Sequence, residues 1–205
     1  MPHAVVAPAM PWLTLLVRRM GSSDHFERMG LQRSFDVDYV QLKKRYQDLQ
    51  RASHPDLLAA AGSGDGVAAQ GSAEAEVESA QINEGYAILA DPLRRAEYLL
   101  ALHGQPITEK DHGNTVDPSL LMEVMEWREE IEEAQQEAQP EVVEALTKDF
   151  RTRQDDAIAA VGKAFALTLA DGECDPQLDQ ARNATIRLKY VRRAVEELEC
   201  LLPAA

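Results

Sequence analysis

Residues 36–56 read DVDYVQLKKRYQDLQRASHPD. Apolar and aromatic side chains recur here at spacings of three, four and three residues, and they are Tyr39, Leu42, Tyr46 and Leu49. This spacing predicts one helix, starting near Asp36, with a single buried stripe. Lys43, Lys44 and Arg51 lie off the stripe, so they should face water or a partner, and with Arg45 they form a basic face.

The helix is expected to end near Ser53, because a proline follows it. Pro55 disfavours helical geometry at His54 and has no N–H group of its own. The tripeptide His54-Pro55-Asp56 therefore leaves the helix as a stiff loop that displays one imidazole and one carboxylate. The segment that follows, residues 59–72, is rich in Ala, Gly and Ser, a composition typical of a flexible loop.

The composition of the 205-residue chain favours helices over sheets. Aromatic residues make up 5% of the chain, and no sustained alternation of apolar and polar residues is present, so we expect an all-α protein. The net charge of −14 argues against wholesale binding to nucleic acid. No apolar run has the length needed to span a membrane. Cys174 and Cys200 form no CxxC pair, so we expect neither a metal site nor a cofactor.

Three further helices are predicted around the first. Ser23-Asp24 can cap a short helix that runs to Met29 and is closed by Gly30. Another helix is expected over residues 73–89, and the side chains predicted to face inward are Val77, Ile82, Tyr86 and Leu89. Asp91-Pro92 begins a fourth helix that ends at His103-Gly104, with proline in its tolerated first turn.

The second half of the chain contains three long amphipathic segments, residues 118–139, 140–170 and 176–202. Short breaks between them predict an antiparallel three-helix bundle. The expected organisation is therefore an extension at 1–23, a first domain at 24–104, a linker at 105–117 and the bundle at 118–203. The extension is free of acidic residues and contains two arginines, so it is either a mitochondrial targeting peptide or a disordered segment.

The first helix of the bundle has more apolar residues than one core can bury. Its core stripe comprises Leu120, Val124, Trp127, Ile131, Ala134 and Ala138. Leu121, Met122 and Met125 point away from this stripe and are flanked by Glu126 and Glu129. Two interpretations are open. In the first, the face has no partner, because the first domain packs on it or because its residues are scattered surface apolars. In the second, the face is a groove for a partner, with adaptable methionines at its centre.

Four stretches in this order resemble the HscB family of iron–sulfur cluster co-chaperones, called Jac-type in mitochondria. They are KRYQDLQRASHPD at 44–56, INEGY at 82–86, DPLRRAEYLLALHG at 91–104 and LMEVMEWREE at 121–130. The likeness covers about residues 24–202. It implies an L-shaped molecule made of a J-domain and a C-terminal three-helix bundle.

The resemblance also implies two partners and no catalysis by this chain. In that family the J-domain stimulates the ATPase of a DnaK-type (70-kDa heat-shock) chaperone, here through His54, Pro55 and Asp56 with the basic face. The bundle binds an IscU-type scaffold protein, through positions that match Leu121, Met122, Met125, Glu126, Glu129 and Tyr190. The expected location is the mitochondrial matrix, with the bacterial cytoplasm as the alternative.

Three other interpretations of the sequence remain open. A generic J-domain protein would handle misfolded clients, but it would carry a Gly/Phe-rich region or Cys-rich zinc repeats. A small enzyme would use His54 and Asp56 as an acid–base pair, which requires a pocket. A purely structural helical adaptor would have no effect on an ATPase.

Overall fold

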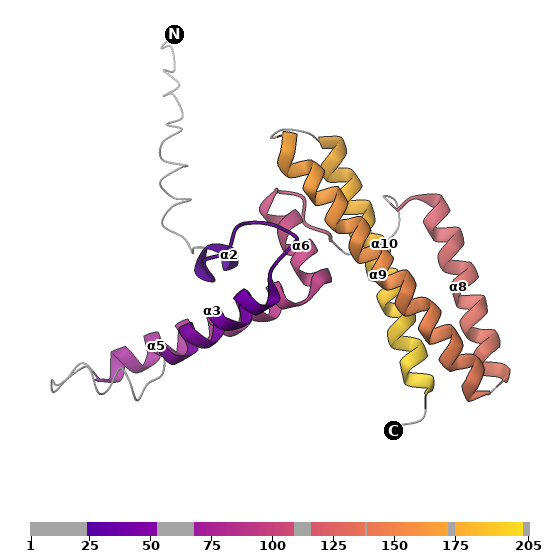
Figure 1. Ribbon diagram of the computed structural model, residues 1–205, viewed down its shortest axis with the longest axis horizontal. Coiled ribbons are helices and arrows are strands. Elements are labelled where there is room, and N and C mark those ends of the chain that lie inside the picture. Colours follow the sequence, from indigo (N-terminus) through magenta and orange to yellow (C-terminus); the bar gives the residue numbers. More distant parts are fainter. Residues whose placement is uncertain (1–23, 53–67, 109–115, 138, 172–174, 203–205) are drawn as a thin grey trace, which may run out of the picture. The chain divides into compact units, whose positions relative to one another are not determined.

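The computed structural model describes residues 24–52, 68–108, 116–137, 139–171 and 175–202. The described elements are all helices, as predicted (Figure 1). They are α2 (His25–Arg28), α3 (Tyr39–Ala52), α5 (Ala68–Ala90), α6 (Pro92–Leu102), α8 (Pro118–Glu137), α9 (Pro140–Asp171) and α10 (Asp175–Leu201). Contacts group them into two compact units. The first unit lies within residues 1–32 and 45–86, and the second within 33–44 and 87–205.

In the first unit, α2 forms as its end signals predict. The Asp24 carboxylate accepts a hydrogen bond from the Glu27 N–H at 2.8 Å, and Gly30 closes the helix with a φ of 63°. Phe26 and Met29 are buried.

The contact between α3 and α5 in this unit is made by aromatic and amide groups. The rings of Tyr46 and Tyr86 stack at a centroid distance of 4.3 Å. The side-chain oxygen of Asn83 accepts hydrogen bonds from the Tyr46 hydroxyl, at 2.9 Å, and from the Gln50 amide, at 2.6 Å. Because higher numbers on α3 meet lower numbers on α5, the two helices run antiparallel here.

Two residues predicted to face inward are exposed. Val77 is 58% exposed, because it lies well beyond Asn83 on α5, at a level that the described part of α3 does not reach. Tyr39 is 50% exposed, although the Arg95 guanidinium lies over its ring and donates hydrogen bonds to its hydroxyl. Leu42 on α3 and Ile82 and Leu89 on α5 are buried as predicted.

In the second unit, α6 begins at the predicted Asp91-Pro92 signal. The Asp91 carboxylate accepts a hydrogen bond from the Arg94 N–H at 2.9 Å. The helix ends before Gly104, whose φ of 81° is a conformation that suits glycine. α6 packs against α9 and α10 of the bundle.

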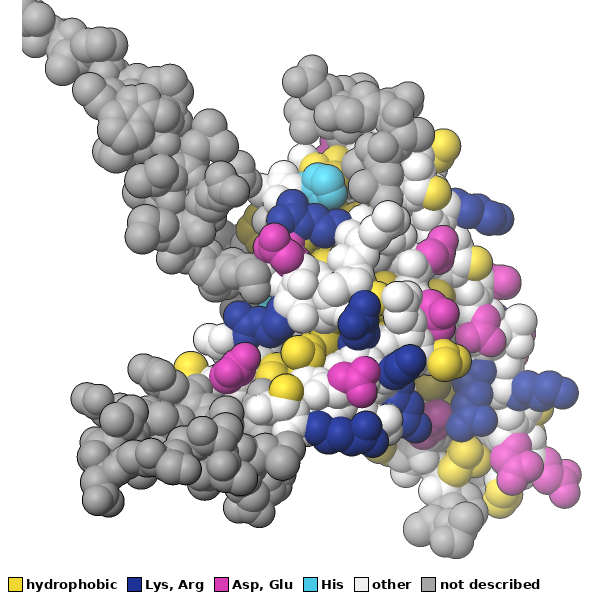
Figure 2. All heavy atoms as spheres, turned by 60° about the vertical axis from the view of Figure 1, so that its left-hand side comes forward, with side chains coloured by type: hydrophobic (Ala, Val, Ile, Leu, Met, Phe, Trp, Pro, Cys, Tyr) yellow, Lys and Arg dark blue, Asp and Glu magenta, His cyan; other side chains and the backbone are white. Residues whose placement is uncertain are grey.

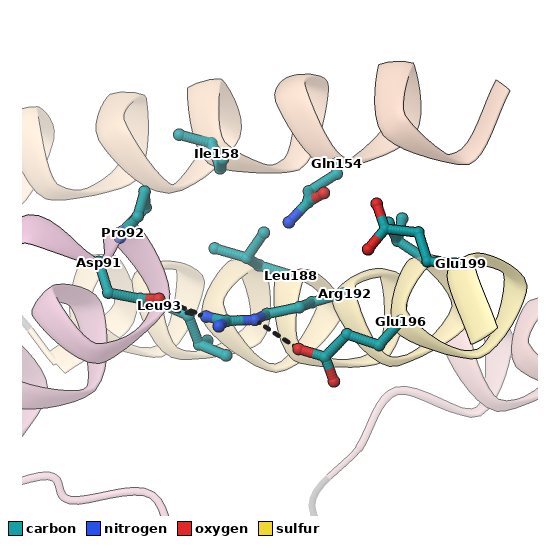
Figure 3. A pocket seen from close by; sticks show the side chains of 10 residues that line it. Asp91, Pro92, Leu93, Gln154, Ile158, Leu188, Arg192, Glu196 and Glu199 are labelled. Atoms are coloured by element: carbon teal, nitrogen blue, oxygen red, sulfur yellow. Dashed lines mark hydrogen bonds and ion pairs between the residues drawn. The ribbon is translucent and has the colours of Figure 1, made fainter. Parts of the chain in front are cut away.

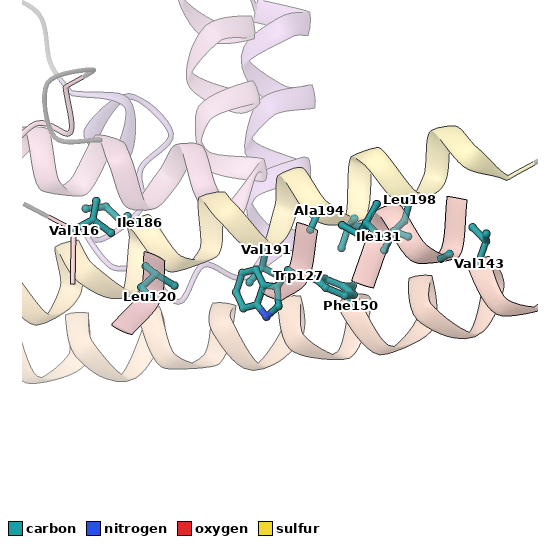
Figure 4. Close-up of a cluster of buried hydrophobic side chains, with 12 residues drawn as sticks. Val116, Leu120, Trp127, Ile131, Val143, Phe150, Ile186, Val191, Ala194 and Leu198 are labelled. Atoms are coloured by element: carbon teal, nitrogen blue, oxygen red, sulfur yellow. The ribbon is translucent and has the colours of Figure 1, made fainter. Parts of the chain in front are cut away.

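The bundle helices α8, α9 and α10 enclose one apolar core (Figure 4). Along this core Val116 and Leu120 lie near Ile186, while Ile131 lies near Leu198, so α8 and α10 run in the same direction. α9 runs against both, which gives the antiparallel bundle predicted from the sequence. At its centre the ring of Trp127 meets Phe150 edge-on, with centroids 5.8 Å apart.

The segment that leads into α3 is held in the second unit by stacked aromatic groups. The ring of Phe35 stacks on Phe165 of α9 at 5.8 Å, and the space beside it depends on Gly162. A Cβ at position 162 would lie 3.3 Å from the Phe35 ring. The buried guanidinium of Arg95 lies over the rings of Phe35 and Tyr39. It also donates a hydrogen bond to the Leu89 carbonyl at 2.6 Å.

Candidate partner-binding surfaces

The predicted chaperone-binding residues lie partly outside the described residues. His54, Pro55 and Asp56 belong to the segment 53–67, which the structure does not describe. The basic face of α3 is described, and its four members Lys43, Lys44, Arg45 and Arg51 are all exposed.

Local contacts of the basic face leave its charge available to solvent. Arg51 has an ion pair with Asp48 at 3.8 Å, and both side chains are at least half exposed. The guanidinium of Arg45 lies over Gly30, with its Nε 3.7 Å from where a Cβ would stand. Figure 2 brings the α3 and α5 side of Figure 1 forward and shows basic side chains interspersed with acidic and hydrophobic ones. This mixture suits a limited protein-docking patch better than a continuous track for nucleic acid.

The predicted scaffold-binding face on α8 is exposed at its centre. Met122 is 66% exposed and Met125 is 64% exposed, and Glu126 and Glu129 beside them are also exposed. We call these four residues the methionine face. Exposed methionines are adaptable contact groups, because the side chain is flexible and polarizable.

Two residues predicted for the same surface are partly buried against the bundle core. Leu121 and Tyr190 are half-buried and pack against the core cluster. The helical spacing of α8 predicted that Leu121 points away from the core stripe, and the family resemblance predicted that both residues contact the scaffold. They reach the core because α8 packs against α9 and α10, and α10 packs against α6, α8 and α9, which widens the buried band beyond a single stripe.

An ion pair on this surface was missed from the sequence. Arg187 of α10 donates a hydrogen bond to Glu123 of α8, with Nη1 and Oε1 3.1 Å apart. The same guanidinium lies 5.8 Å from the Trp127 ring centroid. Glu123 is next in the chain to Met122, so this pair borders the methionine face. The two residues are 64 positions apart, and no local sequence signal reports such a contact.

A pocket of about 310 Å³ lies between α6, α9 and α10 (Figure 3). Its apolar lining includes Leu93, Ile158, Leu188 and Val195. Each of its three acidic side chains forms an ion pair with an arginine. Asp91 and Glu196 both bind Arg192, at 2.7 and 2.9 Å, and Glu199 binds Arg151 at 2.8 Å. These pairs tie α6 and α9 to α10, so the pocket is a structural junction in the second unit.

Replacing Asp91 with alanine is expected to lower the free energy of unfolding by about 1 kcal/mol for the lost helix cap. The loss of the partly exposed pair with Arg192 should add up to about 1 kcal/mol. Asp91→Asn keeps the cap and removes the charge, so it should cost less. Urea unfolding of the two variants and the parent chain measures both steps. Equal stability of Asp91→Ala and the parent would contradict this role.

The same residue predicts a dependence on pH. Burial would raise the pKa of Asp91, but the Arg94 N–H and the Arg192 guanidinium outweigh it and hold that pKa below the ordinary value of 3.8. The ionised form is therefore favoured in the folded state. Its contribution is present above about pH 3.8 and is lost as the pH falls through the lowered pKa. The stability gap between the parent and Asp91→Asn should close over that range.

Known proteins are similar to this chain in both fold and sequence. The structure of the chaperone HscB from Vibrio cholerae superposes with a TM-score of 0.69 at 31% identity, covering 87% of this chain and 96% of that one. The human co-chaperone HscB superposes with a TM-score of 0.71 at 27% identity, covering 87% and 82%. The HscB homologue of Aeromonas salmonicida is 38% identical over 176 residues, covering 86% of this chain and 94% of that protein. The chain belongs to the HscB family of co-chaperones.

The fold of this chain has the two parts that are found in HscB proteins. In HscB proteins a J-domain is followed by a helical bundle, and both parts are present here. The model of the HscB C-terminal oligomerisation domain matches residues 116–199, which includes α8, α9 and nearly all of α10.

The relatives bear on the location expected from the sequence. HscB homologues at 33–38% identity come from bacteria such as Aeromonas and Shewanella, and they give no support to a mitochondrial location. Residues 1–23, on which the targeting interpretation rested, lie outside the described residues. Within the described part of the chain, every helix is too short or too polar to cross a bilayer.

Proposed function

We propose that this HscB-family chain is a co-chaperone of iron–sulfur cluster biogenesis in the bacterial cytoplasm. It binds an IscU-type scaffold protein through the bundle and brings it to a DnaK-type chaperone, whose ATPase it stimulates. The single observation that carries the proposal is the exposed methionine face, found on the bundle of a chain that belongs to the HscB family.

The basic face of α3 supports the chaperone half of the proposal. Its four exposed cations suit an acidic patch on the ATPase domain of the chaperone, because complementary charge speeds encounter and sets orientation. Asp56 would then accept charge-assisted hydrogen bonds from a chaperone arginine or backbone donor. Pro55 would hold the loop geometry, and His54 would supply a further hydrogen bond.

The methionine face supports the scaffold half. Two methionines that are each about two-thirds exposed offer apolar contact area, and the glutamates beside them form a polar rim. Such an arrangement, an apolar centre with a polar edge, is the usual anatomy of a protein interface. Holding scaffold and chaperone on one chain would raise their local concentration without any new contact between them.

Single-turnover ATP hydrolysis by the chaperone tests the proposal. The rate is measured for the chaperone alone, with this chain, with the scaffold, and with both. We expect stimulation by this chain and a further, more than additive, increase when the scaffold is present. Stimulation that ignores the scaffold would instead indicate a generic J-domain co-chaperone for misfolded clients. An unchanged rate under all conditions would refute the proposed function.

A further inference from the structure

Val40 is the most exposed large apolar side chain in the part of the chain that the structure describes. It is 79% exposed, more than either methionine on α8. Isolated exposed apolar residues are common and need no explanation by themselves. Val40 is unusual for its surroundings, because it lies on the basic face of α3.

The position of Val40 on α3 follows from helix geometry. Lys43 and Lys44 stand three and four residues after Val40, so the three side chains share one face of the helix. All three are exposed. Arg51 lies eleven residues after Val40 and returns to the same face, about 16 Å away along the axis. The apolar group thus stands at one end of a row of cations.

The neighbouring residues are anchored elsewhere, whereas Val40 points to solvent. The ring of Phe35 stacks on Phe165 of α9, and the Tyr39 hydroxyl accepts hydrogen bonds from Arg95. The Asp38 carboxylate accepts hydrogen bonds from the N–H groups of Val40 and Gln41 at the start of the helix. These contacts hold the backbone around Val40 in place, while the Val40 side chain extends into solvent.

Acidic residues border the basic face of α3 at the end where Val40 lies. Asp36 and Asp38 are exposed and precede Val40, so the sign of the charge reverses just beyond it. An acidic partner that covers Lys43 and Lys44 would be repelled by these two aspartates. The contact area of such a partner would therefore end near Val40.

We infer that Val40 is an apolar anchor of the chaperone-binding surface, at the end of the basic face that lies at the start of α3. The inference rests on the proposed function and specifies the partner further. The chaperone surface must present a small apolar site beside its acidic patch. The lysines then govern the rate of encounter, while Val40 slows dissociation by burying its side chain.

Substitutions at Val40 can be matched with a control at Val77. Val77 is also a strongly exposed valine, at 58%, but it is on α5. Threonine has nearly the shape and helix propensity of valine and replaces a methyl group with a hydroxyl. Aspartate at position 40 would stand in the first turn of α3, which has no acidic residue, and an acid there favours the helix. A loss of function would therefore not reflect loss of α3.

The test uses the full chain and measures chaperone ATPase stimulation against its concentration. Val40→Thr should raise the half-maximal concentration about five- to tenfold. Its maximal stimulation and its dependence on salt should match those of the parent chain, because no charge has changed. Val40→Asp should weaken stimulation further, since it also places an acid against the acidic partner. Val77→Thr and Val77→Asp should behave as the parent.

Each outcome separates this inference from the proposed function. Equal curves for Val40→Thr and Val77→Thr, in the presence of normal stimulation by the parent chain, would overturn the role of Val40 alone. A parent chain that fails to stimulate the chaperone would overturn the proposed function itself. Circular dichroism of each variant checks that α3 is intact.

Discussion

Replacing His54 with glutamine is expected to reduce chaperone ATPase stimulation to the basal rate. Glutamine keeps the polarity and much of the size of histidine, but its amide group cannot place a hydrogen-bonding atom where the imidazole nitrogens would stand. The proposed contact acts on the ATPase step, so its loss should remove stimulation at saturating concentration instead of merely weakening binding. Even a tenfold reduction corresponds to about 1.4 kcal/mol in the barrier.

The affinity of His54→Gln for the scaffold should be unchanged, because the methionine face belongs to α8. His103 provides a matched control, since its side chain is exposed at the end of α6. His103→Gln should stimulate the ATPase as the parent chain does. Full stimulation by a folded His54→Gln variant would show that the tripeptide only ends a helix.

The second large effect is expected from Met122→Ala combined with Met125→Ala. Both side chains are about two-thirds exposed, so the double variant should retain its stability. Loss of two central apolar contacts should raise the dissociation constant for the scaffold about 10- to 100-fold. Titration calorimetry with the purified scaffold measures this change directly. Stimulation of the chaperone without the scaffold should remain normal.

Leu167→Ala is the control for this double variant, because Leu167 is a half-exposed apolar residue on α9 of the same bundle. It should bind the scaffold with the parent affinity. Leu121→Ala is a less clean test, since Leu121 packs against the core and its loss would lower stability as well. An unchanged affinity in the double methionine variant would place the scaffold site elsewhere on the chain.

Local signals in the sequence predicted the helices well. Asp91-Pro92 and Gly104 mark the ends of α6, because capping and positive φ depend on residues within one turn. The core stripe of α8 was also correct at Leu120, Trp127 and Ile131, since helical spacing alone sets which side chains share a face.

The errors arose where distant segments decide burial. Val77 has the correct helical spacing for the core, but the described part of the facing helix does not reach it. Leu121 was placed off the core because the prediction assumed one narrow stripe for the helix. The stacking of Arg95 on Phe35 and Tyr39 joins residues more than 50 positions apart, and nothing in the local pattern reports it. The roles of the tripeptide and of the two faces stay predictions.

The packing of Phe35 and Asp91 has a practical consequence for dividing this chain into fragments. A fragment that ends at residue 104, after the expected first domain, would lack Phe165, on which Phe35 stacks, and Arg192, which binds Asp91. The cut would expose an aromatic ring beside the start of α3 and leave a carboxylate without its cation. Such a fragment should be less soluble, and its α3 less ordered at the first turn, than in the whole chain. Weak activity of the fragment would therefore measure the damage of the cut and not the contribution of the bundle to chaperone binding.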